Sequence, residues 1–498
     1  MTHTPTEEQA LIIAAVAAGK SIIVNALAGA AKTSTIQMAA PKCPANTLAL
    51  AFNKGIQMEL EGRLPSTFQV KTINALGFAA WKKIAGNPQL DSSKVSKIMR
   101  RLDPKAPWDL AKVVSSAKLN GLVVATRKHM GQGILEDTRP NWEALADDLD
   151  TTLVRDDPYT RERKDYLDLC RKTLEASIDE SFTVSIDFDD QVYMPTCFGA
   201  PFPKFDCVMV DEAQDLSPLN HLMLKKLKPP QLIVVGDPLQ SIYAFRGADT
   251  QSMPKLGADW NLEPFTLSVC FRCATSIVEV ARTWAPHMQS PEWMQQGEVK
   301  FDITDDEGMW DMDSLPPAVT ILCRNNAPLI KLALKIFKTR KIAFLNSRAE
   351  SAMLSALRTI LRYKKDLTLE QVAGKIETSR MNKLDNEDPK KHERIMDEHD
   401  ALQFCVDSAL AEGRDYAGLE RLISELFQNK NANVWFGTGH GAKGKEWDTV
   451  LHLDPWRLPS KYALSEEALQ QESNIHYVIS TRAKTNLVHA NLDQYREF

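Results

Sequence analysis

The chain lacks the excess of basic residues that is typical of proteins with a broad nucleic-acid-binding surface. It has 60 lysines and arginines against 65 aspartates and glutamates, which gives a formal net charge of −5 at pH 7. This nearly neutral balance excludes a generally basic surface. Any nucleic-acid site is therefore expected to be a local channel.

Membrane-spanning and secretory segments are also missing from the sequence. No apolar run reaches about 18 residues, the length that a helix needs to cross a bilayer. The first residues, MTHTPTEEQ, lack the basic and apolar regions of a secretory signal. We therefore expect a soluble, cytoplasmic protein with no membrane partner.

Cysteine is scarce, with eight residues that are scattered except for the close pair Cys270 and Cys273. Because a second CxxC pair is missing, a four-cysteine zinc or iron–sulfur site lacks ligands. Reduced thiols, as in cytosolic proteins, are expected instead.

The length and composition indicate a globular protein of several domains. A chain of 498 residues is too long for one hydrophobic core, so roughly two to four domains are expected. Its 44% apolar and 25% charged residues are typical of globular proteins. We find no internal repeat or low-complexity tract in the sequence.

The N-terminal residues predict a helix that leads into a β–loop–α–β unit. Thr4 is suited to cap this helix, Pro5 to its first position and Glu7 to a capping box. A second helix is expected from about residue 32 to residue 40, where a proline follows.

Buried strands are predicted from short apolar runs that fall into two groups. The first group is Ser21–Ala26, Thr47–Phe52, Phe205–Val210 and Gln231–Val235. The second group is Ala318–Leu322, Val434–Phe436, Thr449–Leu453 and Tyr477–Ser480. Strands of this kind that alternate with helices predict parallel sheets of the α/β class. Polar, helical stretches interrupt both groups and are expected to be insertions.

A phosphate site is predicted where the first strand meets the second helix. The connecting segment, Ala26–Thr33 (ALAGAAKT), has small residues that let backbone N–H groups surround phosphates beside a helix N-terminus. Lys32 is placed to reach the β- and γ-phosphates, and the Thr33 hydroxyl to bind Mg²⁺. Alanines replace both glycines of the GxxxxGK[ST] pattern. The segment alone is therefore also compatible with an ordinary small-residue turn.

Two carboxylates supply the second half of this site. In Val208–Asp215 (VMVDEAQD), Asp211 and Glu212 follow a buried strand at the end where parallel sheets bind ligands. Asp211 is suited to hold Mg²⁺ through water, and Glu212 to orient and deprotonate the attacking water. A lone acidic pair after a strand is common, but beside a lysine-bearing loop it predicts nucleotide hydrolysis.

The motifs around these residues resemble a known family. DEAQD at Asp211–Asp215 and GDPLQSIYAFRGA at Gly236–Ala248 are similar to motifs II and III of UvrD/Rep-type DNA helicases of superfamily 1. The further matches, in family order, are TEEQ ending at Gln9, AFNK at Ala51–Lys54, LSVCFR at Leu267–Arg272, TGHGAKGKEW at Thr438–Trp447 and YVISTRA at Tyr477–Ala483. The short insertions and DFDD at Asp187–Asp190 resemble the F-box DNA helicase branch more than UvrD itself.

The resemblance implies two RecA-like α/β motor domains, each interrupted by a mostly helical insertion. The first would comprise residues 1–80 and 182–266, with its insertion at 81–181. The second would comprise residues 267–348 and 429–498, with its insertion at 349–428. ATP and Mg²⁺ would bind in the cleft between the motor domains, and single-stranded DNA would lie across their tops.

Roles in ATP binding and hydrolysis follow from the same resemblance. Arg272 and Arg482 would act as arginine fingers on the γ-phosphate, because guanidinium is always charged and matches phosphate geometry. Gln240 would sense that phosphate. The catalytic candidates are Lys32, Asp211, Glu212, Gln240, Arg272 and Arg482, and the Mg²⁺ candidates are Thr33 and Asp211. The ATP-binding candidates are Gln9 and Phe271 at adenine, Glu446 at the ribose, and Ala28, Gly29, Ala30, Ala31, Lys32, Thr33 and Ser34 at the phosphates.

The resemblance also implies DNA contacts. The candidates are Phe52, Asn53, Thr72, Asn74, Tyr243, Phe245, Arg246 and His440. Aromatic rings stack on any base, which suits a motor that steps along arbitrary sequence. Core packing is the alternative for the aromatic candidates, and Tyr243 is also compatible with a place beneath the nucleotide. Two departures from the family pattern, Ala31 for glycine and Asn74 for histidine, bear on the hydrolysis rate and on one DNA contact.

The implied function is ATP-dependent movement along single-stranded DNA with 3′→5′ polarity. It would drive unwinding of tailed duplex DNA or displacement of bound proteins. Three alternatives stay open: a protein-stripping translocase with little unwinding, an RNA helicase, and a nucleotide-dependent binding module with defective hydrolysis. Single-strand-binding, recombination or replication proteins are the expected partners, and a bacterial or phage protein would be nucleoid-associated.

Overall fold

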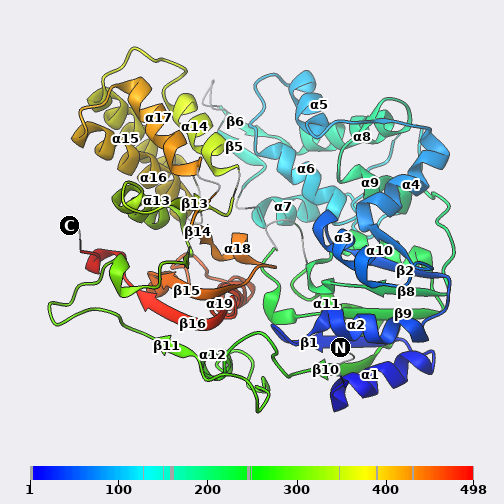
Figure 1. Ribbon diagram of the computed structural model, residues 1–498. Helices are drawn as coiled ribbons and strands as arrows, with labels where there is room; N and C mark the ends of the chain where they lie inside the picture. The colour runs from blue at the N-terminus through cyan, green and yellow to red at the C-terminus, as the bar shows by residue number, and fades with distance from the viewer. Residues whose placement is uncertain are drawn as a thin grey trace. The chain divides into compact units, whose positions relative to one another are not determined.

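The computed structural model describes residues 4–126, 128–149, 151–156, 162–243, 247, 249–346, 348–387, 391–428 and 431–496. By its contacts the chain divides into two units (Figure 1). Unit 1 comprises Met1–Leu27 and Ala31–Leu267, and unit 2 comprises Ala28–Ala30 and Ser268–Phe498.

Unit 1 contains a six-stranded sheet in the order β10-β1-β9-β8-β2-β3, with all neighbours parallel. Its strands are β1 Ile22–Ala26, β2 Thr47–Ala51, β3 Gln69–Thr72, β8 Cys207–Val210, β9 Gln231–Gly236 and β10 Glu263–Leu267. The four central strands were predicted as apolar runs. The two edge strands were not, because β3 and β10 are partly exposed and carry polar residues.

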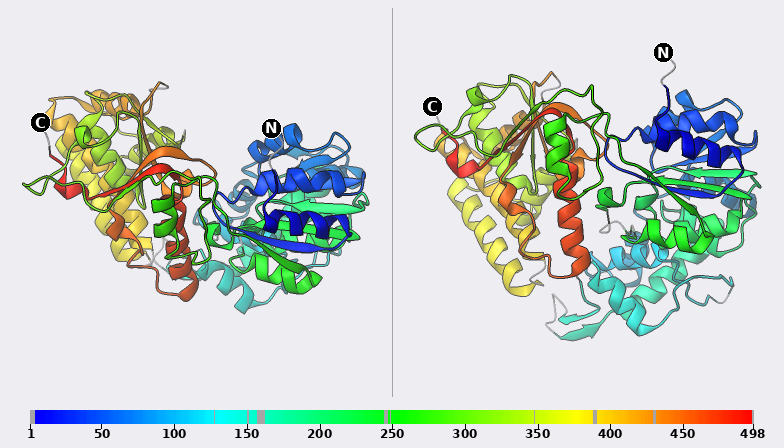
Figure 2. Two further views of the ribbon diagram at one scale, coloured as in Figure 1. Left: turned by 60° about the horizontal axis from the view of Figure 1, so that its bottom comes forward. Right: turned by 90° about the horizontal axis from the view of Figure 1, so that it is seen from below.

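Helices cover both faces of this sheet (Figure 2). They are α1 Glu7–Ala17, α2 Lys32–Ala39, α3 Lys54–Arg63, α4 Ile73–Ala85, α10 Pro218–Leu227 and α11 Ser252–Trp260. Every residue of β8 and β9 is buried, as expected for strands covered on both sides.

The start of α1 differs from the prediction. Its N-cap is Thr6 rather than Thr4, and the capping box closes with Gln9 rather than Glu7. The Thr6 hydroxyl accepts from the Gln9 backbone N–H at 3.2 Å, while the Gln9 amide oxygen accepts from the Thr6 backbone N–H at 3.0 Å. Thr4 and Thr6 both lie near the start of this helix, and Thr6 is the N-cap because it forms the reciprocal hydrogen bonds with Gln9.

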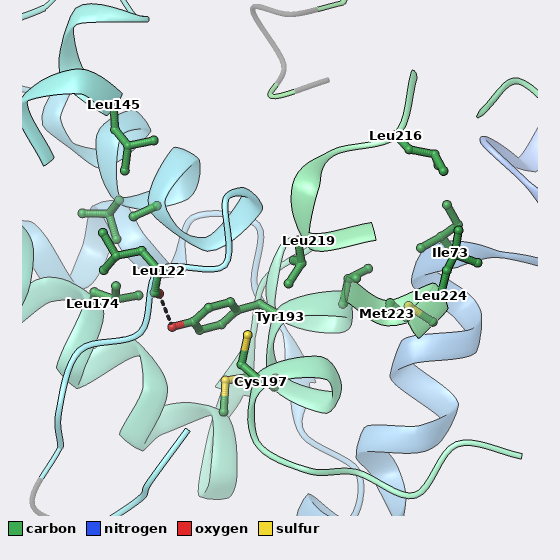
Figure 3. Close-up of a cluster of buried hydrophobic side chains, with 14 of the residues drawn as sticks. Ile73, Leu122, Leu145, Leu174, Tyr193, Cys197, Leu216, Leu219, Met223 and Leu224 are labelled. Carbon is green, nitrogen blue, oxygen red and sulfur yellow. Dashed lines mark hydrogen bonds between the residues drawn. The ribbon is translucent and has the colours of Figure 1, made fainter. Parts of the chain in front are cut away.

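A mostly helical insertion separates α4 from β8. Its helices are α5 Lys94–Leu102, α6 Leu110–Leu119, α7 Arg139–Asp147, α8 Leu167–Thr183 and α9 Asp190–Cys197. Two short ladders accompany them, β4 Gln89–Leu90 with β7 Ser185–Ile186, and β5 Val154–Asp156 with β6 Arg163–Asp165. Figure 3 shows apolar side chains of the insertion in one buried cluster with Ile73 of α4 and Leu224 of α10. In this cluster the Tyr193 hydroxyl donates to the Leu122 carbonyl at 2.7 Å.

Buried ion pairs also fix the insertion. Lys94 contacts Asp190 at 2.7 Å, and Lys118 contacts Asp187 at 2.6 Å and Asp190 at 2.7 Å. Both lysine side chains are at most 1% exposed. Mutual pairing is what makes such burial tolerable, since an unpaired buried charge is strongly destabilising.

Unit 2 contains a second six-stranded parallel sheet, in the order β11-β16-β15-β12-β14-β13. Its strands are β11 Glu298–Lys300, β12 Val319–Cys323, β13 Ile342–Phe344, β14 Val434–Thr438, β15 Trp447–Leu453 and β16 Ala483–Ala490. Helices α12 Thr275–Ala281, α13 Asn326–Ile336, α18 Gly439–Ala442 and α19 Glu466–Ser480 accompany the sheet. Four helices lie between β13 and β14, and they are α14 Ala349–Ile360, α15 Leu369–Asn386, α16 His392–Ala411 and α17 Tyr416–Phe427.

The prediction of a strand at Tyr477–Ser480 was wrong. These residues form the last turn of α19, and the strand of this region, β16, begins at Ala483. The Ser465 hydroxyl caps α19 by accepting from the Ala468 N–H at 3.1 Å. A buried helical turn and a buried strand give the same short apolar run, so the run alone does not distinguish them.

The predicted fold class is confirmed: two parallel α/β sheets, each interrupted by a mostly helical insertion, consistent with two RecA-like domains. Within the described ranges, no helix has the length and apolar character needed to span a membrane.

Candidate functional site

The predicted phosphate loop follows β1 and ends at the N-terminus of α2. Gly29 has φ +70°, and a Cβ there would lie 2.7 Å from Cβ of Arg272, so glycine is required. Ala31 is the N-cap of α2 and has the left-handed values φ 57° and ψ 39°. This conformation costs a non-glycine residue roughly 1–2 kcal/mol. Ala28 and Ala30 are buried, whereas Ser34 in the first turn of α2 is exposed.

Lys32 contacts Glu212, with 2.9 Å between Nζ and Oε1. Burial opposes the charged form of Lys32, but the carboxylates of Glu212, Asp211 and Asp237 outweigh it and raise the pKa. Glu212 itself has a left-handed φ of 53°, and its second oxygen accepts from the Gln214 amide at 2.5 Å. Such backbone strain is typical of functional sites.

Asp211 and Asp237 follow the neighbouring strands β8 and β9. Burial, and then the charge of Glu212, raise the pKa of Asp211 to about 7. Asp237 is fully buried, and its carboxylate accepts from the Gln240 amide at 2.6 Å. Its backbone N–H donates to the Gln214 side-chain oxygen at 3.0 Å. One polar network therefore links Glu212 to Gln240.

Sequence reasoning assigned no role to Gln214 or Asp237, although both lie in quoted motifs. The position of Asp237 directly after β9 could have indicated a role, because the carboxyl ends of parallel strands meet at one edge of a sheet. The hydrogen bond between Gln214 and Asp237 joins residues 23 positions apart, and the sequence alone does not reveal it.

The residues fit a Mg²⁺ ion that is bound together with a nucleotide. Mg²⁺ prefers oxygen ligands and commonly takes one or two carboxylates, with waters and phosphates completing its shell. Asp211 and the Thr33 hydroxyl, on the second residue of α2, are ligands of this type. No cluster of three or more His, Cys, Asp or Glu side chains in the described chain forms a metal site by itself.

Gln9, the candidate adenine reader, has an amide with other contacts. It is 5% exposed, and its Nε2 donates to the Thr35 hydroxyl at 3.0 Å. Its Oε1 accepts from Thr6 in the capping box. Because both ends of the amide are in use, reading adenine requires Gln9 to exchange hydrogen bonds.

In unit 2, residues of three predicted motifs lie together. The Phe271 N–H donates to the Gly29 carbonyl at 2.9 Å. Arg272 forms an ion pair with Glu446, with 2.5 Å between Nε and Oε2. Arg482 is 1% exposed, and its guanidinium donates to the carbonyl of Lys445 at 3.2 Å. Both arginines are thus held by two consecutive residues of the segment before β15.

The DNA-binding candidates of unit 1 lie at the carboxyl ends of β2, β3 and β9. Phe52 and Tyr243 are parallel, with ring centroids 6.3 Å apart and planes 5° apart. Asn53 and Thr72 cap α3 and α4 through their side chains. The remaining candidates are His440 on α18 in unit 2, and Phe245 and Arg246, which lie outside the described residues.

Phe188 is an aromatic residue at this edge that sequence reasoning missed. The Asn74 side-chain amide donates to the Phe188 carbonyl at 2.7 Å, and the Phe188 residue is 54% exposed. Its neighbours Asp187 and Asp190 are held by the buried Lys118. A rigid backbone therefore presents an exposed ring beside the start of α4. The DFDD segment was the available signal.

Two segments of the chain match known protein-family domains. Residues 165–261 match the UvrD/REP helicase N-terminal domain, and residues 362–492 match the UvrD-like helicase C-terminal domain. The first match contains Asp211, Glu212 and Gln240, and the second contains Glu446 and Arg482.

Three relatives illustrate the similarity. F-box DNA helicase protein 1 of Schizosaccharomyces pombe is 25% identical over 97% of this chain and 57% of its own length. F-box DNA helicase 1 of Gallus gallus is 26% identical over 50% of this chain and 24% of its own length. ATP-dependent DNA helicase UvrD2 of Mycobacterium tuberculosis is 25% identical over 65% of this chain and 50% of its own. The matched regions thus span between 24% and 57% of the length of these relatives.

Proposed function

Because the chain belongs to the UvrD/Rep-type helicases of superfamily 1, we propose that it is an ATP-driven DNA motor. It couples ATP hydrolysis to movement along single-stranded DNA with 3′→5′ polarity. The observation that carries the proposal is the polar network from Lys32 through Glu212 and Gln214 to Asp237 and Gln240. It lies at the sheet edge where parallel α/β proteins bind their ligands.

In the proposed reaction, Lys32 exchanges Glu212 for the β- and γ-phosphates of ATP. Glu212 then orients a water molecule and accepts its proton as the water attacks the γ-phosphorus, while the bond from the γ-phosphorus to the bridging oxygen of the β-phosphate breaks and ADP leaves. Asp211 and Thr33 would hold a Mg²⁺ ion bound with the nucleotide, which would neutralise phosphate charge. The 2.9 Å contact between Lys32 and Glu212 supports these roles, because it places the phosphate-binding ammonium group beside the carboxylate that is proposed to accept the proton.

Arg272 and Arg482 are proposed to stabilise negative charge in the transition state. Arg272 must leave its ion pair with Glu446 to do so, and Glu446 then becomes available to the ribose. Arg482 must exchange backbone carbonyls for phosphate oxygens. Both arginines are therefore proposed to contact the phosphates only when nucleotide is bound.

Gln240 is proposed to link loss of the γ-phosphate to the DNA strand. It donates to Asp237 and lies three residues before Tyr243, whose ring faces Phe52. A shift of Gln240 would therefore move one wall of the Phe52–Tyr243 pair. Phe188 extends the proposed stacking surface along the same sheet edge.

Cellular partners follow from the proposed substrate. Single-strand-binding, recombination or replication proteins are the proposed partners, in the cytoplasm or nucleoid. The motor-domain and insertion boundaries given above are part of the same proposal.

The test is to measure ATPase activity with and without single-stranded DNA, and unwinding of duplexes with 3′ or 5′ tails. DNA should stimulate hydrolysis, and the 3′-tailed duplex should unwind; Lys32→Ala is the inactive control. Displacement of a bound protein without unwinding would favour the stripping translocase, and stimulation by RNA alone would favour an RNA helicase. Tight ATP binding without turnover would refute the motor.

A further inference from the structure

Two cysteines flank the proposed arginine finger of the first half of unit 2. Cys270 and Cys273 lie on either side of Phe271 and Arg272, in the segment that precedes α12 (Figure 1). Both are free thiols, and both side chains are 0% exposed. The backbone N–H of Cys273 donates to the Cys270 sulfur at 3.4 Å. The segment thus folds the second cysteine back onto the first.

The surroundings of Cys270 favour its thiolate. Its sulfur accepts hydrogen bonds from the Cys273 thiol and from the backbone N–H groups of Cys273 and Arg272. These bonds, that of the Cys273 thiol first, lower the pKa of Cys270 to about 6 although burial opposes them. In four other cysteines burial raises the pKa to about 12, and these are Cys170, Cys197, Cys323 and Cys405. Since the thiolate is the reactive form of cysteine, Cys270 differs chemically from these four.

Cys273 also contacts the segment that carries the second proposed finger. Its sulfur lies 3.6 Å from the carbonyl oxygen of Thr481, which is a second acceptor for the thiol. Thr481 directly precedes Arg482, and its hydroxyl accepts from the Arg482 guanidinium at 3.2 Å. The pair of sulfurs is therefore hydrogen-bonded to the backbone beside each arginine, and all of these residues belong to unit 2.

We propose that Cys270 and Cys273 form a reversible disulfide through which a peroxide switches the ATPase off. This inference rests on the proposed function, in which Arg272 and Arg482 stabilise the transition state. A peroxide is the oxidant class because both sulfurs are fully buried, which requires a reagent close to water in size. Transient disulfides of this kind serve redox sensing in proteins whose thiols are otherwise kept reduced.

The reaction converts two thiols and one hydrogen peroxide into one disulfide and two waters. The Cys270 thiolate attacks one peroxide oxygen and the O–O bond breaks, which leaves a sulfenic acid and a hydroxide that takes up the proton lost by Cys270. The Cys273 sulfur then attacks the Cys270 sulfur, the S–O bond breaks, and the departing hydroxide takes the Cys273 proton. The two sulfurs are oxidised and the two peroxide oxygens are reduced. A dithiol reverses the change by thiol–disulfide exchange.

The disulfide would alter the backbone beside both arginines. An S–S bond is about 2.0 Å long, so Cys273 must move toward Cys270 and away from the Thr481 carbonyl. Arg272 would then lie inside the closed ring, although its proposed role requires it to leave the ion pair with Glu446. Because a shift of about 1 Å in a catalytic group can lower a rate roughly 10²-fold, kcat should fall by about tenfold or more.

The test treats the reduced full-length protein with hydrogen peroxide and then with dithiothreitol, and measures ATPase activity with single-stranded DNA at each stage. In wild type, kcat should fall by about tenfold or more in peroxide and recover in dithiothreitol. Trypsin cleaves after Arg272, between the two cysteines, so mass spectrometry without reductant should find the two peptides joined. Cys270→Ser and Cys273→Ser should give no joined peptides, and Cys270→Ser should keep its activity in peroxide.

Cys43→Ser is the matched control. Cys43 and Cys207 form a second pair of hydrogen-bonded thiols, in unit 1. The Cys43→Ser variant should respond to peroxide as wild type does. Loss of the response in this variant would assign the switch to the other pair and overturn the proposal.

Three results in wild type would also overturn the switch. They are a lack of joined peptides, a kcat that survives their formation, and an inactivation that dithiothreitol does not reverse. Peptide mapping in wild type needs no variant, so the proposal stays testable if Cys270→Ser fails to fold. A reduced wild type without ATPase activity refutes the motor, whereas an active one that peroxide leaves unchanged refutes only the switch.

Discussion

Ala31→Gly tests whether the left-handed alanine strains the phosphate loop. At φ 57° the Cβ of Ala31 costs about 1–2 kcal/mol, which glycine avoids. Glycine also increases the conformational entropy of the unfolded chain, which lowers the free energy of unfolding by about 0.4–1 kcal/mol. Taking mid-range values, the variant should be more stable by about 0.8 kcal/mol. For a unit of this size that corresponds to a rise in Tm of about 2 °C.

Thermal unfolding and ATPase turnover should be measured on the same preparations. Turnover of Ala31→Gly should differ from wild type by less than about tenfold, the equivalent of about 1.4 kcal/mol in the barrier. The matched control is Ala30→Gly, whose position is not among the left-handed residues. It relieves no strain, so its Tm should fall.

Two results would refute this reasoning. If Ala31→Gly lowers Tm as much as Ala30→Gly does, the left-handed conformation stores no strain. If glycine instead raises turnover several hundredfold, the natural loop cripples catalysis. The nucleotide-dependent binding module would then be the better description of the protein.

Four further predictions concern the catalytic centre and the strand. Lys32→Ala should leave less than about a tenth of wild-type turnover but nearly normal nucleotide-free DNA affinity, and higher turnover would contradict its phosphate role. Arg272→Ala and Arg482→Ala should each lower kcat by roughly 10² or more, and a loss of ATP affinity alone would indicate ground-state positioning. Phe188→Ala should weaken single-strand binding by about 1–3 kcal/mol in a fluorescence titration, with basal ATPase intact; loss of basal ATPase would make it a structural residue. Since the pKa of Asp211 is raised to about 7, the free energy of unfolding of the nucleotide-free protein should fall as pH rises from about 4 to about 7. Tm measured against pH should show this fall in wild type and less of it in Asp211→Asn; the same profile in both proteins would contradict the prediction.

Buried strands could be predicted from sequence because burial on both faces requires continuous apolar runs. The edge strands β3 and β10 of unit 1 escaped prediction because they have polar, partly exposed residues that resemble loops. The edge strand β13 of unit 2 also escaped prediction, although it is apolar and Ile342 and Ala343 are buried. The end of α19 was taken for a strand because a four-residue apolar run has no visible period.

The candidate site was predictable only in part. Topology brings the residues after β1, β8 and β9 to one sheet edge, so the neighbourhood of Lys32 and Asp211 followed from the strand assignments. The pairing of Gln9 with Thr35 and the left-handed conformation of Ala31 did not follow. Such features depend on hydrogen bonds between distant segments and on backbone angles that residue types only bias. The catalytic roles stay predictions.

The buried pairs of Lys94 and Lys118 have a practical consequence. Ions in solution screen exposed charges strongly and buried pairs very little. Association with DNA depends on displaced counterions and weakens steeply as salt concentration rises. High salt should therefore release DNA from this protein while the buried pairs continue to hold the helices of its insertion together. Raising the ionic strength should thus dissociate the DNA without unfolding the insertion.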